Sequence, residues 1–376
     1  MRETIARFEL AVPQAELDRL RDKLAALRWP ERETVEDWSQ GVPLRVMQEL
    51  VDYWRSRYDW RRCEKLLNGW GQYRTAIDGL GIHFLHVISP EPQALPLIMT
   101  HGWPGSVIEF HKVIGPLTNP VAHGGCARDA FHLILPSLPG YGFSDRPATT
   151  GWRVERIARA WIELMGRLGY ERWVAQGGDW GAAVTSFIGQ LAPAGLAGIH
   201  LNVPFLIPPA GDATEEEQRI LADRERYEAV LSGYAKQQST RPQTLGYALL
   251  DSPLGLAAWI YERFYDWTDH DGSPESIFTR DELLDNIMLY WLPGTGASAA
   301  RLYWESLMRL PFGQVHVPTG VSVFPREMHR ASRRWVLAAF PHLIHFGTPS
   351  RGGHFAAFEQ PASFVEELRT TFAPLR

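Results

Sequence analysis

The sequence has few cysteines, no excess of positive charge and no long hydrophobic run. Its 376 residues include two cysteines, Cys63 and Cys126, too few for a disulfide framework and outside any CxxC zinc or redox pair. The 38 Lys and Arg against 43 Asp and Glu give a net charge of −5, which excludes a basic surface for nucleic acid. No apolar run approaches membrane-spanning length, and the first residues lack the pattern of a signal peptide. We therefore expect a cytoplasmic protein without a membrane anchor or a nucleic-acid partner.

Aromatic residues, in contrast, are abundant, with fifteen tryptophans along the chain. Residues 1–90 are rich in them and have the apolar spacing typical of helices. The helical pattern repeats at Leu17, Leu20, Leu24 and Leu27, and again at Met47, Leu50, Val51 and Trp54. We predict a helical amino-terminal domain over residues 1–90, with a face that could support a homodimer.

Beyond this domain, short apolar runs alternate with helical patterns, as in a mostly parallel sheet flanked by helices. The predicted strands are 83–88, 95–100, 131–135, 173–176, 196–202, 320–324 and 342–346. Residues 204–316 interrupt the alternation with helices, one of which begins at a capping box of Thr279 and Glu282. We predict an α/β core over 91–203 and 317–376, with a helical lid over 204–316.

A strand followed by small residues around one acidic residue gives the strongest local signal. The sequence GGDWGA follows the predicted strand 173–176 and matches the nucleophile elbow of the α/β-hydrolase fold, with Asp179 at the nucleophile position. A carboxylate that attacks a saturated carbon forms an alkyl ester, so the expected electrophile is an epoxide or an alkyl halide. The alternative is a surface turn, because GGD is common turn chemistry.

The loop after strand 95–100 reads HGWPG and precedes the elbow in the order that this fold requires. In this fold, that loop and the residue after the nucleophile each supply one backbone N–H to the oxyanion hole. Trp103 and Trp180 are therefore the candidate donors. Without the elbow, HGWP would be only a turn-forming βα loop.

Candidates for the general base and its orienting acid follow in the expected chain order. His354 in RGGHF follows the predicted strand 342–346, and Glu327 in VSVFPRE follows the strand 320–324. The alternatives are a polar loop histidine and a solvated carboxylate at the start of a helix.

Several motifs in this order resemble the microsomal-type epoxide hydrolases: HGWPGS, LPGYGFSD, GGDWGA, VSVFPRE and RGGHFAAFE. Residues 1–90, with RWP, GVPL, YDWR and IDGLGIHFLHV, look like the amino-terminal domain peculiar to that family. The resemblance implies an α/β-hydrolase fold, an epoxide substrate, and a mechanism with neither cofactor nor metal. Membrane-bound members carry an amino-terminal anchor, so this chain resembles a soluble bacterial-type member.

The resemblance also implies two lid tyrosines over the substrate, Tyr234 in SGY and Tyr303 in RLYWE. A phenol can hydrogen-bond and protonate the alkoxide that forms when an epoxide opens. Tyr227, Tyr247 and Tyr261 are rivals for the first position. The expected reaction is attack by Asp179 to give a hydroxyalkyl ester, then hydrolysis to a vicinal diol by water that His354 deprotonates.

Two other functions fit parts of the pattern. A haloalkane dehalogenase also uses an Asp nucleophile, but it needs N–H donors for a halide and no proton donor. A binding protein on a catalytically dead hydrolase scaffold would have lost the rest of the site. The lid tryptophans Trp259, Trp291 and Trp304 make an apolar or aromatic epoxide the expected substrate, although lid core packing is the favoured interpretation for each of them singly.

Overall fold

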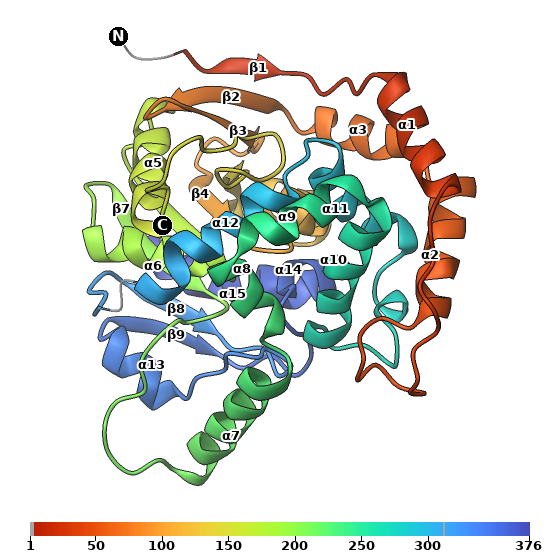
Figure 1. Cartoon of the computed structure of the whole chain (residues 1–376). Helices are drawn as coiled ribbons and strands as arrows, with labels where there is room; N and C mark the ends of the chain where they lie inside the picture. Colours follow the sequence, from red (N-terminus) through yellow and green to blue (C-terminus); the bar gives the residue numbers. More distant parts are fainter. Residues whose placement is uncertain (1–3, 311–312) are drawn as a thin grey trace.

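The structure, a computed structural model, describes residues 4–310 and 313–376. Nine strands of these residues form one sheet in the order β1-β2-β3-β5-β4-β6-β7-β8-β9 (Figure 1). Following this spatial order, neighbouring strands are antiparallel from β1 as far as β5. From β5 through β4 to β9 they are parallel. The parallel strands are β4 (Leu95–Thr100), β5 (Phe131–Pro136), β6 (Trp173–Gly177), β7 (Leu196–Leu201), β8 (Thr319–Ser322) and β9 (Leu343–Gly347).

The helices around these strands connect them in the manner of an α/β core. Most residues of β4, β5 and β6 are buried, as expected for strands covered on both faces. The connecting helices are α4 (His111–Thr118), α5 (Val154–Arg167), α6 (Trp180–Leu191), α13 (Arg333–Ala339), α14 (Ala356–Glu359) and α15 (Pro361–Phe372). The single-turn 3₁₀ segments are η1 (Val107–Phe110), η2 (Pro120–His123), η3 (Ala127–Asp129) and η6 (Ala373–Leu375).

The amino-terminal region is not purely helical, which corrects the sequence prediction. Its elements are β1 (Ala6–Phe8), α1 (Gln14–Ala25), α2 (Leu44–Ser56), α3 (Trp60–Gly69), β2 (Gln72–Ile77) and β3 (Leu80–Val87). The three strands extend the sheet, so this region shares it with the core. The prediction missed β2 because polar Gln72 and Thr75 occupy buried positions and hide its apolar pattern. Gln72 is satisfied there by His83, whose Nε2 lies 2.9 Å from its Oε1.

Helices dominate the segment between β7 and β8, as the sequence predicts. They are α7 (Glu215–Val230), α8 (Gly233–Thr240), α9 (Pro242–Asp251), α10 (Pro253–Trp267), α11 (Arg280–Trp291) and α12 (Gly296–Ser306), with the 3₁₀ turns η4 (Pro274–Ser276) and η5 (Leu307–Arg309). The predicted capping box of Thr279 and Glu282 starts α11. Helix α12 packs against α8 and α9, whereas α7 reaches away from the body at the bottom of Figure 1.

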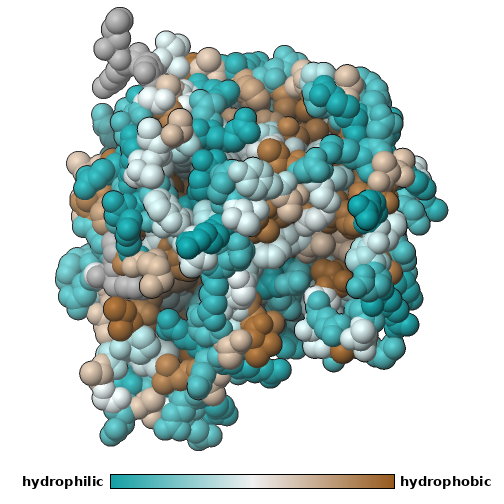
Figure 2. Space-filling view, viewed as in Figure 1, coloured by the Kyte–Doolittle hydropathy of each residue, from teal (hydrophilic) through white to brown (hydrophobic). Residues whose placement is uncertain are grey.

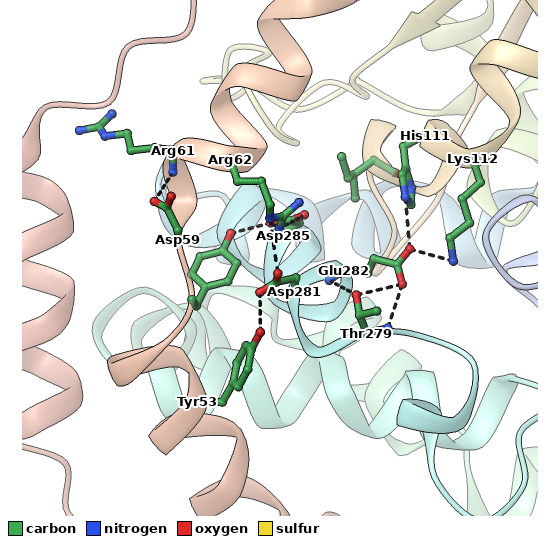
Figure 3. Close-up of polar contacts among 12 residues, drawn as sticks. Tyr53, Asp59, Arg61, Arg62, His111, Lys112, Thr279, Asp281, Glu282 and Asp285 are labelled. Atoms are coloured by element: carbon green, nitrogen blue, oxygen red, sulfur yellow. Dashed lines mark hydrogen bonds and ion pairs between the residues drawn. The ribbon is translucent and has the colours of Figure 1, made fainter.

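Helix α11 is anchored from two sides (Figure 3). On the amino-terminal side, Arg62 of α3 makes two hydrogen bonds of 2.7 Å to the carboxylate of Asp285, and Tyr58 donates a third of 2.7 Å. On the core side, Lys112 of α4 lies 2.8 Å from Glu282. The amino-terminal region therefore braces the helical segment that lies over the core.

The surface has the mixed character of a globular protein. The face shown in Figure 2 is mostly hydrophilic, with apolar residues scattered across it. In the part of the chain that the structure describes, no helix has both the length and the apolar composition needed to cross a bilayer.

Candidate active site

Asp179 lies at a sharp turn between β6 and α6. Its φ of +51° and ψ of −129° are a combination that residues with a side chain rarely adopt. Glycines make the turn possible: a Cβ at Gly177 would lie 2.1 Å from the carbonyl oxygen of Gly181, and one at Gly181 would lie 1.9 Å from that of Thr100. This strained strand-to-helix turn has the geometry of a nucleophile elbow.

The loop after β4 passes directly over the Asp179 carboxylate. The backbone N–H of Trp103 donates a hydrogen bond of 2.8 Å to Oδ1 of Asp179. Gly102 has no room for a side chain, since a Cβ there would lie 2.1 Å from the same oxygen. Trp180 is the first residue of α6, so its backbone N–H belongs to the unpaired first turn beside Asp179.

His101 supports this loop from below. Its Nδ1 lies 2.9 Å from the carbonyl oxygen of Gly102, and the N–H of Leu138 donates to its Nε2 at 3.3 Å. Burial lowers the pKa of His101 to about 4, so the ring is neutral, with one nitrogen donating and the other accepting. The sequence analysis gave His101 no role, and its position at the end of a strand is the only signal that could have suggested one.

His354 lies between two carboxylates. Its Nε2 is 3.3 Å from Oδ2 of Asp179, and its Nδ1 is 2.9 Å from Oε2 of Glu327. Burial alone would lower the pKa of His354, but the charge of Glu327 and the contacts with both carboxylates outweigh it. The pKa is therefore held well above its ordinary value, and the ring is protonated at neutral pH.

Tyr234 and Tyr303 reach the same place from the helical segment above. Tyr234, at the start of α8, stacks on the Trp103 ring with centroids 5.1 Å apart. Tyr303, on α12, meets the Trp180 ring edge-on at 4.8 Å. Burial is the main cause that raises the pKa of both tyrosines, so both hydroxyls are protonated donors.

The three rival tyrosines lie in different surroundings. Tyr247 is 70% exposed, and Tyr261 faces Glu275 at 3.4 Å. Tyr227, on α7, has its hydroxyl 2.7 Å from that of Tyr234, so it belongs to the site as a neighbour. The sequence analysis considered Tyr227 only as a competitor, because a contact between two helices leaves no mark in sequence spacing.

A cavity of about 350 Å³ extends from Asp179 beneath the helical segment. This volume suits a small-molecule ligand. Polar lining near Asp179 comes from Tyr227, Tyr234 and Tyr303, and apolar lining includes Phe205, Leu206, Ile220, Leu307 and Trp335.

The lid tryptophans follow the packing interpretation. Trp259, Trp291 and Trp304 are not among the described residues that line this cavity, and Trp304 is 45% exposed. The indole N–H of Trp259 donates 3.1 Å to Gln238, an ordinary contact within the helical segment. The packing alternative is therefore the correct interpretation for these side chains.

A second, much smaller cavity of about 20 Å³ lies against Asp179. Glu109, Gln176, Asn202 and His354 line it together with Asp179. Within residues 4–310 and 313–376, this cavity included, no group of three or more His, Cys, Asp or Glu side chains is arranged to hold a metal ion.

Comparisons with known proteins agree with this geometry. The family profile described as the epoxide hydrolase N terminus matches residues 5–110, and that of the alpha/beta hydrolase fold matches residues 96–243. Epoxide hydrolase 1 of Sus scrofa is 37% identical over 98% of this chain and 88% of its own. The chain belongs to the epoxide hydrolase family. A protein of Stigmatella aurantiaca strain DW4/3-1, named provisionally as an epoxide hydrolase, is 60% identical over 99% of this chain and 86% of its own.

Solved structures of epoxide hydrolases superpose on the whole chain. Juvenile hormone epoxide hydrolase from the silkworm Bombyx mori has a TM-score of 0.92 at 31% identity, covering 100% of this chain and 95% of its own. The epoxide hydrolase of Aspergillus niger has a TM-score of 0.89 at 29% identity, covering 99% of this chain and 97% of its own. The predicted family and α/β-hydrolase fold are thus confirmed, and so is the enzyme class, a hydrolase that acts on epoxides.

Proposed function

We propose that this epoxide hydrolase works through a covalent ester on Asp179. Asp179 attacks one ring carbon to form a hydroxyalkyl ester, and water then hydrolyses the ester to a vicinal diol. The observation that carries the proposal is the position of the Asp179 carboxylate. It lies between a cavity lined by two buried tyrosyl hydroxyls and the His354–Glu327 pair. These are the nucleophile, acid and base that the two half-reactions need.

Ring opening needs a proton donor, because the carbon–oxygen bond breaks as an alkoxide forms. Tyr234 and Tyr303 donate hydrogen bonds to the epoxide oxygen and one of them supplies the proton. Two donors on the leaving oxygen favour an epoxide over an alkyl halide, whose stable anion needs no proton. They also favour an enzyme over a binding protein on a dead scaffold, which has no use for either hydroxyl.

The charge of Asp179 then controls the base. In the free enzyme the two carboxylates keep His354 protonated. Ester formation removes the charge of Asp179, so the pKa of His354 falls and the ring releases its proton to solvent, which in turn restores the proton that the tyrosine gave to the alkoxide. Neutral His354, oriented by Glu327, deprotonates the water that attacks the ester carbonyl. Diol release restores the Asp179 carboxylate and the protonated ring, which balances the cycle.

The oxyanion of the second step forms on the carbonyl oxygen of the ester. The N–H groups of Trp103 and Trp180 are its proposed donors, and the Trp103 N–H already contacts the carboxylate at 2.8 Å. Each donor of such a hole contributes about 3 kcal/mol to catalysis.

The division of the chain and the substrate class are part of the proposal. The core of 91–203 and 317–376 carries the nucleophile, base and acid, the lid of 204–316 carries the tyrosines, and the first domain braces the lid. The apolar lining of the larger cavity supports an apolar or aromatic epoxide. A cytoplasmic location and a homodimer stay predictions.

A single turnover in heavy-oxygen water tests the covalent mechanism, with excess enzyme and styrene oxide as the probe. The new oxygen of the first diol comes from unlabelled Asp179, and the label enters the peptide that carries Asp179. Label that goes directly into the diol would overturn the mechanism. Diol and halide assays on styrene oxide and a chloroalkane distinguish the dehalogenase alternative.

The variant Tyr303→Phe tests the donor role. We expect slower alkylation of Asp179 by roughly 10²-fold, the lower range for lost acid catalysis. The exposed Tyr247→Phe is the matched control. Unchanged alkylation in Tyr303→Phe, measured by rapid quench and protein mass, would remove this residue from the site.

A further inference from the structure

The small cavity beside Asp179 contains a carboxyl group that the proposed reaction does not use. Glu109, in the turn η1 after the HGWPG loop, lines this cavity together with Asp179 and His354. The backbone leaves room for it: a Cβ at Gly105 would lie 2.0 Å from Oε2 of Glu109. The cavity volume of about 20 Å³ accommodates about one water molecule.

The polar lining of the cavity suits a water molecule. Gln176 is almost fully buried, and its Nε2 donates 2.7 Å to Oδ1 of Asn202. Among the described residues, its Oε1 has no hydrogen-bond partner. A buried acceptor without a partner is costly, so this side of the cavity calls for a donor, either a water molecule or the O–H of a protonated carboxyl.

Glu109 itself is held in the neutral form by its surroundings. Burial raises the pKa of its carboxyl to about 8; the charge of Asp179 acts in the same direction, and His354 opposes it. Tyr290, the other titratable group that senses Glu109, is itself protonated, because burial raises its pKa well above the ordinary value. A neutral carboxyl presents a carbonyl oxygen that accepts a hydrogen bond.

We propose that Glu109 positions the water that hydrolyses the ester on Asp179, with the small cavity as the binding site of that water. The inference rests on the covalent mechanism proposed above. One proton of the water goes to Nε2 of His354, and its oxygen forms the bond to the ester carbonyl carbon. The second hydrogen points to the carbonyl oxygen of Glu109, which fixes the direction of the attacking lone pair. The bond to the diol oxygen then breaks, the proton on His354 neutralises that oxygen, and the acid proton left on Asp179 passes to His354.

Neutrality of Glu109 matters for the base. An ionised Glu109 would be a third negative charge near His354 and would keep the ring protonated after the ester forms. The neutral group orients water and leaves the protonation of His354 under the control of Asp179. Glu109 is thus a positioning residue for the second half-reaction and contributes nothing to ring opening.

Two variants separate the half-reactions, with styrene oxide as the probe. Glu109→Leu keeps the approximate volume but removes the acceptor, and Glu109→Gln keeps a neutral acceptor. Rapid quench and protein mass give the rates of ester formation and hydrolysis. We expect hydrolysis to fall roughly 10- to 100-fold in Glu109→Leu, the loss typical of a misplaced reactant. Hydrolysis in Glu109→Gln, and ester formation in both variants, should stay within about threefold of the unsubstituted enzyme, a change of less than 1 kcal/mol.

The pH profile gives a second readout that a purely structural role would not change. In the unsubstituted enzyme, ester hydrolysis should decline as the pH rises above about 8, because burial, the main cause of the raised pKa of Glu109, persists when the ester has formed. Glu109→Gln should lack this decline. The profile tests the proposal even if Glu109→Leu does not fold.

Several results would overturn the proposal. These are normal hydrolysis in Glu109→Leu, equal slowing of both half-reactions, hydrolysis in Glu109→Gln as slow as in Glu109→Leu, or a decline near pH 8 that persists in Glu109→Gln. Absence of any ester in the unsubstituted enzyme would instead overturn the covalent mechanism. An ester that forms normally while the Glu109 variants behave like the unsubstituted enzyme would remove only the role of Glu109.

Discussion

Helices α11 and α7 belong to the same segment above the core but are held in opposite ways. Eight of the twelve residues of α11 are buried, against three of the sixteen residues of α7. Helix α11 is tied to the amino-terminal region and to α4 (Figure 3). Helix α7 is held by the pairs of Glu217 with Arg334 and Asp223 with Arg330, and by the buried side chains of Ile220 and Tyr227.

This difference separates the two candidate proton donors. Tyr303 lies on α12, whose main packing partners are α9 and α8. Tyr234 begins α8 soon after α7 ends, and its hydroxyl contacts that of Tyr227 on α7. We infer that the amino-terminal region fixes one side of the substrate cavity, while α7 leaves the other side able to yield when substrate enters.

The largest expected effect comes from breaking the anchor of α11. Asp285→Ala leaves Arg62 and Tyr58 without their shared carboxylate, whose side chain is 3% exposed. Loss of one partner from such a pair should lower the free energy of unfolding by about 3 kcal/mol. Urea unfolding measures it, with the exposed Asp52→Ala of α2 as the control. Equal stability of the two variants would mean that the amino-terminal region does not brace the lid.

The second anchor of α11 is Glu282, and its contribution to the free energy of unfolding should depend on pH. Burial alone would raise the pKa of Glu282, but hydrogen bonds from His111, Lys112 and Thr279 lower it to about 2. A lowered carboxyl pKa stabilises the fold above the unfolded pKa of about 4.5, and this contribution disappears as the pH falls from about 4.5 to 2.

Glu282→Gln should therefore lower the free energy of unfolding by about 2 kcal/mol at pH 7, with a shrinking difference in acid. Unfolding curves at a series of pH values measure it. The exposed Glu36→Gln is the control and should show no such trend. A difference that stays constant down to pH 2 would contradict the assigned anchor.

Loosening α7 should affect mobility more than stability. Asp223→Asn weakens the exposed pair with Arg330, and we expect hydrogen exchange in α7 to become several-fold faster while α11 stays protected. The unfolding midpoint should change less than in Asp285→Ala. Exchange measured by mass spectrometry, peptide by peptide, provides the test. Equal acceleration in α11 would show that the two helices open as one unit.

The sequence predicts the parts of this molecule that depend on local pattern. Strand β4 is predicted to the residue, and the small residues around Asp179 predict the turn that the structure contains. Strand β2 was not predicted because its buried face carries the polar Gln72, which is satisfied by contacts with Asn68 and His83 that no sequence pattern shows. The places of Glu109 and Tyr227 in the site were not predicted either, because they depend on contacts between separate elements. The roles of the site residues remain proposals that kinetics must test.

The smallest expected effect concerns the contact between α7 and Tyr234. Tyr227→Phe removes one hydroxyl while keeping the ring, which packs against His329 with centroids 5.2 Å apart. The hydrogen bond from Tyr227 makes the Tyr234 hydroxyl a better acid, so its loss should slow ester formation by about threefold and leave ester hydrolysis unchanged. The buried Tyr261→Phe is the matched control, measured by the same rapid-quench assay. A loss as large as that of Tyr234→Phe would mean that Tyr227 contacts the substrate itself. No change would mean that helix α7 does not tune the acidity of Tyr234.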